Sequence, residues 1–144
     1  MKKVITDGCI NGWIWSLPDD NVIKKKLLTI ESPKNNFYKK YYIDDAKLVD
    51  LLGCKKIIIY GAGDFGQRSL DKITNKGLSI NGIVDGSKDK IGTEWNGHVI
   101  MSMSDLLNTY NPNEYFVIVG SHEYLTEMIE NLEKNYIFEI GIVC

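Results

Sequence analysis

Three glycines with the spacing G-x-G-x-x-G separate an apolar run from a helix-like pattern. They are Gly61, Gly63 and Gly66, in the segment KKIIIYGAGDFGQRSL. In such a turn the first glycine permits the tight bend, the second lets a pyrophosphate approach the backbone, and the third brings the helix close to the sheet. Free amides at the helix start, together with the helix dipole, favour an anion. Because three glycines at this spacing arise easily by chance, the motif depends on its context.

An acidic residue stands where this motif requires one. Asp85 ends the next expected strand, nineteen residues after Gly66. The dinucleotide-binding fingerprint places Asp or Glu about twenty residues on, where the carboxylate binds ribose hydroxyls. This role favours an unphosphorylated ribose such as that of NAD. The alternative is that Asp85 only caps the turn VDGSKDK.

The first turn of the helix carries a charge that competes with a phosphate. Asp64 stabilises a helix start by about 0.3–1 kcal/mol, and Arg68 follows at i+4, the favourable orientation for an ion pair. A self-capped helix with a structural Asp64–Arg68 pair is therefore the alternative to nucleotide binding, in which Arg68 would turn to the ligand. We favour nucleotide binding.

Further candidates follow the fourth expected strand, at the sheet edge where ligands of such folds bind. Ser121 also suits the N-cap of the next helix, and we expect His122 to be a solvated histidine more often than a ligand contact. No catalytic or metal-binding set is predicted, since the chain has two histidines and no Tyr-x-x-x-Lys pair. The predicted nucleotide-binding residues are Gly61, Ala62, Gly63, Asp64, Phe65, Gly66, Arg68, Asp85, Gly86, Gly120 and Ser121.

The elements that position these residues alternate between strand and helix. Apolar runs and helical periodicity predict strands at 55–60, 78–84, 96–101, 114–121 and 136–143, and helices at 44–53, 64–77, 102–110 and 121–134. Such alternation predicts right-handed crossovers and a parallel sheet. The fold class is α/β: a Rossmann-like, doubly wound sheet of about five strands, order 3-2-1-4-5, with helices on both faces.

Residues 1–43 are predicted to form a small N-terminal extension to this domain, which spans residues 44–144. The segments CINGWIWSL and VIKKKLLTI read as strands, and FYKKYYIDD as a solvated edge or partner-facing strand, with a nucleic-acid or sugar platform as the less favoured reading. Trp13, Trp15 and the tyrosines of 38–42 would cover a sheet edge or form a dimer seam. Of the oligomeric states we favour a homodimer.

Composition excludes several classes of protein. A net charge of −2 argues against nucleic-acid binding. Three widely spaced cysteines fit neither a zinc site nor a disulfide framework. No window is long and apolar enough for a membrane span, and the N-terminus does not read as a secretion signal. These features predict a cytoplasmic protein.

The segment from Ile57 to Leu107 resembles a recurrent bacterial domain. The shared elements are YGAG-x-x-G at 60–66, the strand ending in Asp85, Gly92 to Val99, and the helix start at Ser102. The resemblance covers roughly residues 54–144 and is to Rossmann-type nucleotide-binding domains of surface-polysaccharide biosynthesis proteins. It implies NAD or a UDP-type nucleotide sugar as ligand, and a glycan-biosynthesis enzyme as partner.

Three functions compete on this reading. The first is a non-catalytic nucleotide- or sugar-nucleotide-binding module of bacterial surface-polysaccharide biosynthesis. The second is a sugar-nucleotide oxidoreductase or epimerase fragment that needs a partner chain, because we expect no second mononucleotide-binding half, hexapeptide repeat or transferase domain here. The third is a degenerate Rossmann scaffold for protein docking, and CoA binding is a weaker variant. We favour the first.

Overall fold

A computed structural model describes residues 32–109, 111–135 and 138–143. Its elements follow in the order α3 (Pro33–Tyr41), α4 (Asp45–Leu52), β1 (Lys56–Tyr60), α5 (Asp64–Asn75), β2 (Gly82–Val84), β3 (Glu94–Trp95), β4 (His98–Met101), α6 (Met103–Thr109), the 3-10 turn η1 (Pro112–Glu114), β5 (Tyr115–Val119), α7 (Leu125–Asn135) and β6 (Glu139–Gly141). None of the helices described is long and apolar enough to cross a membrane.

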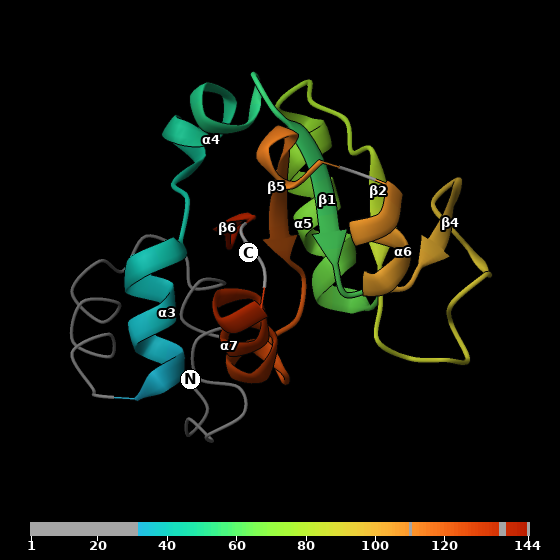
Figure 1. The fold of residues 1–144 in the computed structure, drawn as a ribbon. Coiled ribbons are helices and arrows are strands. Elements are labelled where there is room, and N and C mark those ends of the chain that lie inside the picture. The colour runs from blue at the N-terminus through green and yellow to red at the C-terminus, as the bar shows by residue number, and fades with distance from the viewer. Residues whose placement is uncertain (1–31, 110, 136–137, 144) are drawn as a thin grey trace, which may run out of the picture.

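The strands form a mixed, mostly parallel sheet with the order β3-β4-β2-β1-β5-β6 (Figure 1). Strand β1 is central and pairs in parallel with β2 on one side and with β5 on the other. The predicted order 3-2-1-4-5 and the α/β class are confirmed. The addition is β3, which pairs antiparallel with β4 after the turn at Asn96 and Gly97, both with positive φ.

Helices cover both faces of the sheet because alternate residues of β1 point to opposite sides. Ile57 and Ile59 enter one apolar cluster with residues of α4 and α5. Ile58 enters the other cluster, with Leu106 of α6 and residues of α3 and α7. A strand buried on both faces reads as a continuous apolar run, and this is why the run at 57–59 predicts the centre of the sheet.

The segment FYKKYYIDD is helical at its start, so its prediction as an edge strand is wrong. Helix α3 begins after Ser32, whose hydroxyl accepts a hydrogen bond from the Asn35 amide at 3.0 Å, and Pro33 occupies the first turn. Tyr38 is buried in the cluster that contains α7, and Tyr41 donates to Glu133 of α7 at 2.5 Å. The chain then bridges to the sheet, where Tyr42 pairs with Ile142.

The remaining expectations for the N-terminal extension lie outside the described residues. They concern the two strands before Ser32 and the pair Trp13 and Trp15. The boundary between residues 43 and 44 stays a prediction, as does the homodimer.

Candidate functional site

The carboxyl ends of β1, β2 and β5 meet at one edge of the sheet. Helix α5 follows β1 and packs on one face, whereas α7 follows β5 and packs on the other. The chain therefore leaves these neighbouring strands in opposite directions, which creates the crevice where ligands of doubly wound folds bind. A cleft of about 890 Å³ lies there, within the size range of ligand sites.

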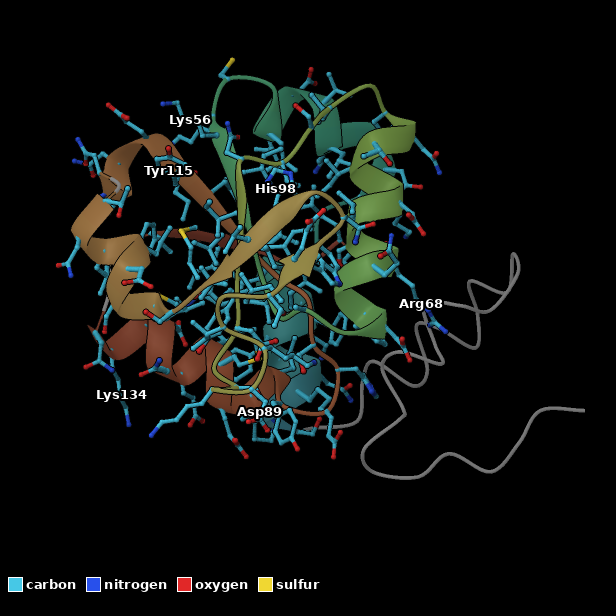
Figure 2. All side chains as sticks on the ribbon, turned by 90° about the vertical axis from the view of Figure 1, so that its right-hand side faces the viewer. Lys56, Arg68, Asp89, His98, Tyr115 and Lys134 are labelled. Atoms are coloured by element: carbon cyan, nitrogen blue, oxygen red, sulfur yellow. The ribbon has the colours of Figure 1, made fainter. Side chains whose placement is uncertain are left out.

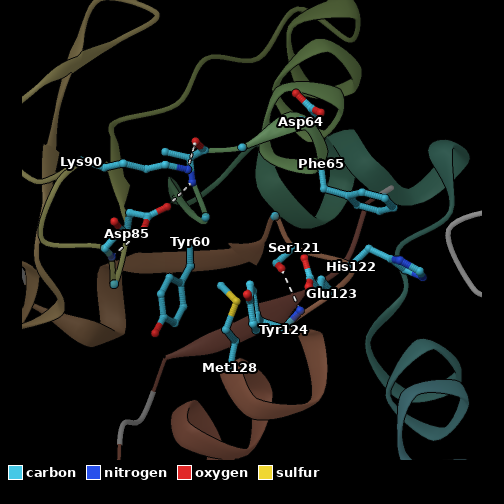
Figure 3. A pocket seen from close by; sticks show the side chains of 16 residues that line it. Tyr60, Asp64, Phe65, Asp85, Lys90, Ser121, His122, Glu123, Tyr124 and Met128 are labelled. Atoms are coloured by element: carbon cyan, nitrogen blue, oxygen red, sulfur yellow. Dashed lines mark hydrogen bonds between the residues drawn. The ribbon is translucent and has the colours of Figure 1, made fainter. Parts of the chain in front are cut away.

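Three loops line the cleft (Figure 3). The lining residues are Tyr60, Gly61, Ala62, Gly63, Asp64 and Phe65 after β1; Asp85, Gly86, Ser87 and Lys90 after β2; and Gly120, Ser121, His122, Glu123, Tyr124 and Met128 after β5. Of the predicted binding residues, Gly66 and Arg68 are not among them. Tyr60, Ser87, Lys90, Glu123, Tyr124 and Met128 were not predicted.

The outer glycines of the motif are required by packing. Gly61 has φ +120°, and a Cβ there would lie 2.7 Å from the carbonyl oxygen of Gly120. A Cβ on Gly66 would lie 2.0 Å from the carbonyl oxygen of Gly61. The close approach of α5 to the ends of β1 and β5 therefore needs both positions without side chains.

Packing does not require glycine at the middle position of the motif, Gly63. Gly63 has φ −129° and ψ −160°, extended backbone that any residue adopts. A Cβ on Gly63 would meet nothing within 4 Å, and Gly63 lines the cleft. Its missing side chain leaves open cleft beside the backbone, as the approach of a pyrophosphate requires.

Side chains from the loop after β2 hold the backbone of Ala62 at both its amide and its carbonyl group. Asp85 accepts from the Ala62 amide at 2.7 Å through Oδ2 and from the Ser87 amide at 2.8 Å through Oδ1. Lys90 Nζ donates to the Ala62 carbonyl oxygen at 3.0 Å. Asp85 therefore ties two loops together, and this supports the loop-capping alternative for its carboxylate.

Helix α5 begins without a side-chain cap. Gly63 is its N-cap residue and makes no side-chain cap bond, and the first bond of the helix runs from the Gln67 amide to the Gly63 carbonyl at 2.9 Å. In the described part of the chain, no hydrogen bond is made by the amides of Gly63, Asp64 and Phe65. These are the orphan donors of a helix start.

The expected Asp64–Arg68 pair is not formed among the described residues. The Arg68 guanidinium lies over the ring of Phe65 instead, 5.5 Å from its centroid. Figure 2 shows Arg68 on the outer side of α5. The proposal that Arg68 turns to a ligand stays a prediction, because Arg68 does not line the cleft.

His122 is half-buried, so its prediction as a solvated histidine is wrong. Its ring stacks on Phe65 with centroids 5.1 Å apart (Figure 3). Burial, followed by the charges of Lys34 and Arg68, lowers the pKa of His122 to about 4. Its ring is therefore neutral at pH 7, and Nε2 is buried with no partner among the described residues.

Ser121 has a structural role alongside its place on the cleft. Its hydroxyl accepts a hydrogen bond from the Tyr124 amide at 3.1 Å, in the turn before α7. Helix α7 begins only at Leu125, so Ser121 caps the turn before the helix and is not the predicted N-cap residue. Within the described ranges, no group of three or more His, Cys, Asp or Glu side chains could hold a metal ion.

The topology and the glycine turn define a Rossmann-like α/β domain with a cleft at its switch point. Residues 53–143 match the family described as C2185-like, N-terminal, and the chain belongs to this family.

Two solved structures show distant similarity. One is a crystal structure of RSP, a Rex-family repressor, at 16% identity and a TM-score of 0.47, with 68% of this chain and 58% of that chain covered. The other is RSP in complex with β-NADH, at 17% identity and a TM-score of 0.44, with 69% and 59% covered. Each match spans less than two thirds of the repressor. A search of curated proteins finds no match.

Proposed function

We propose that the cleft binds a nucleotide and that the protein serves as a nucleotide-binding module, not as an enzyme by itself. The observation that carries this proposal is Gly63. Its backbone angles suit any residue and its Cβ would meet no neighbour, so neither strain nor packing requires a glycine there, and the N-cap preference for glycine is shared by Ser, Thr, Asp and Asn. A phosphate seated against the backbone gives a reason for glycine.

The surroundings of Gly63 fit the same ligand. The unpaired amides at the start of α5 donate toward an anion, and the dipole of this helix of 12 residues adds to the attraction. On the side of β5 and α7 the cleft is lined by Tyr60, Tyr124 and Met128 (Figure 3). These large side chains suit a flat or apolar group next to the phosphates.

The lining offers little for catalysis. A general base near pH 7 needs a pKa close to that value, and the pKa of His122 is lowered to about 4. Asp85 holds two backbone amides. A fragment that gains its catalytic residues from a partner chain is the alternative that these features leave open.

The two finer hypotheses about the ligand are NAD and a UDP-type sugar nucleotide. The second, with a role in bacterial surface-polysaccharide biosynthesis, rests on the sequence resemblance alone. A docking scaffold is the less supported function, because it predicts a cleft blocked by side chains, whereas the volume is about 890 Å³.

Calorimetric titration tests the proposal. The ligands are NAD⁺, NADH, UDP-N-acetylglucosamine and CoA, added to the wild type, to Gly63→Val and to Ser79→Val as the matched control. Ser79 is exposed and does not line the cleft. We expect the wild type and the control to bind one of these ligands equally well, and Gly63→Val to bind it at least about tenfold more weakly because its side chain fills the phosphate position.

Thermal unfolding of the three proteins separates binding from folding. Since a Cβ on Gly63 has open space, all three should unfold cooperatively at similar temperatures. Silence across the whole ligand panel refutes nucleotide binding. An unchanged affinity in a folded Gly63→Val variant refutes the role assigned to the glycine turn.

A further inference from the structure

We propose that Lys90 binds the phosphate of the ligand, and that its hydrogen bond to Ala62 is the resting position from which it does so. The inference rests on the proposed function and names the group that the cleft recognises. Lys90 lies outside the glycine motif and outside the strands and helices, on the loop between β2 and β3.

The position of the ammonium group is the first support. Lys90 Nζ lies 3.0 Å from the carbonyl oxygen of Ala62, the residue directly before Gly63. The amide of the same residue donates to Asp85 at 2.7 Å. The ammonium group is thereby placed at the glycine turn, beside the backbone that a phosphate would approach (Figure 3).

The charges along the cleft are the second support. Three carboxylates line it, those of Asp64, Asp85 and Glu123, and among its described lining residues Lys90 carries the one cationic side chain. These carboxylates repel a phosphate, and Lys90 is the lining side chain whose positive charge can offset this repulsion. Asp64 points away from Tyr60 and Tyr124 in Figure 3.

The hydrogen-bonding capacity of Lys90 is the third support. An ammonium group has three donors, and among the described residues Lys90 Nζ makes one hydrogen bond. Either a free donor reaches the phosphate, or the bond to the neutral Ala62 carbonyl is exchanged for a stronger charge-assisted bond. Asp85 already accepts two amides, so phosphate recognition on this side depends on Lys90.

Binding measurements with ligands of decreasing phosphate content test this role. The probes are NAD⁺, AMP, adenosine and inorganic pyrophosphate, and the variants are Lys90→Met, Lys90→Arg and Lys88→Met. Lys88 is the matched control, since it is exposed on the same loop but does not line the cleft. Thermal unfolding verifies that each variant is folded.

We expect Lys90→Met to lower the affinity for NAD⁺, AMP and pyrophosphate by roughly ten- to a hundredfold, because one charge-assisted hydrogen bond is lost. The affinity for adenosine should change less than about twofold. Lys90→Arg should recover part of the affinity for the phosphate-containing ligands, and Lys88→Met should bind all ligands as the wild type does. If Lys90→Met leaves NAD⁺ unchanged or weakens adenosine equally, the inference is overturned while nucleotide binding stands.

The pyrophosphate arm separates the two proposals in the opposite case. If the wild type binds no nucleotide but binds pyrophosphate in a Lys90-dependent manner, the nucleotide proposal fails and the role of Lys90 stands. If neither nucleotides nor pyrophosphate bind, both are overturned.

Discussion

Replacing Gly61 and Gly63 separately by alanine should have very different effects on stability. At Gly61 the residue would keep φ +120° with its Cβ 2.7 Å from the backbone oxygen of Gly120. A strained backbone angle costs about 1–3 kcal/mol, and overpacking against atoms that cannot move away costs a further amount of about 1–3 kcal/mol. The expected loss is therefore about 2–6 kcal/mol, a large share of the roughly 5–15 kcal/mol typical of a domain.

At Gly63 two small effects oppose each other. Alanine is a poorer N-cap residue than glycine by up to about 1 kcal/mol, while its smaller unfolded-state entropy stabilises by about 0.4–1 kcal/mol. No clash adds to these, since a Cβ there has nothing within 4 Å. Urea unfolding followed by circular dichroism should give a free energy close to the wild type for Gly63→Ala and at least about 2 kcal/mol lower for Gly61→Ala. Equal losses in the two variants would refute this division between packing and binding glycines.

Two further predictions concern the surroundings of the cleft, and a third concerns the contact between α3 and α7. The pKa of His122 is lowered from 6.5 to about 4 in the folded state, so the unfolded state binds the proton first as pH falls. The free energy of unfolding should therefore fall as pH drops from about 6.5 to 4. Urea unfolding at several pH values should show a smaller fall for His122→Phe, which keeps the stack on Phe65. Asp85→Asn has one acceptor oxygen for two amides, so its free energy of unfolding should be lower by about 1–3 kcal/mol. A change under about 0.5 kcal/mol would contradict the role of Asp85 in holding the two loops together. Glu133→Ala removes the acceptor of Lys40 and Tyr41, so hydrogen exchange should speed up in α3 and stay unchanged in β1. Equal exchange in α3 before and after the substitution would show that the packing of α3, with Tyr38 buried, holds this helix without these bonds.

Much of the fold is predictable because burial on both faces leaves a clear sequence pattern. The runs around Ile58 and Val117 contain no polar residue, as strands of the sheet centre require. Helix α3 was missed because its aromatic residues have β-propensity, although Ser32 and Pro33 are helix-start signals. Burial of Tyr38 against α7 depends on distant residues, which local propensity does not include.

The residues of the cleft can likewise be separated into those that the sequence could predict and those that it could not. The residues directly after β1 and β5, from Gly61 to Phe65 and Gly120 with Ser121, could be predicted because the ends of parallel strands meet at one edge. Those farther along the chain into α7, such as Tyr124 and Met128, could not. Strand β3 had its own signal in the Asn96–Gly97 pair, which is typical of tight hairpins. Lys90 had none: the loop conformation brings it to Ala62, and no spacing rule fixes such a contact. The half-burial of His122 likewise follows from its stack on Phe65.

Gly63→Asp is a substitution for which stability and binding should change in opposite directions. Glycine at an N-cap leaves the amides of the first turn free, whereas an aspartate accepts hydrogen bonds from them and its charge interacts favourably with the helix dipole by about 0.3–1 kcal/mol. The side chain has open space, so urea unfolding should show an equal or slightly higher free energy. The same carboxylate would occupy the phosphate position beside Lys90 and repel the ligand, so calorimetry should show binding reduced by more than about tenfold. Because a misfolded variant loses both properties together, a stable protein that no longer binds points specifically to the amides of α5, and a stable protein that binds normally would place the phosphate elsewhere.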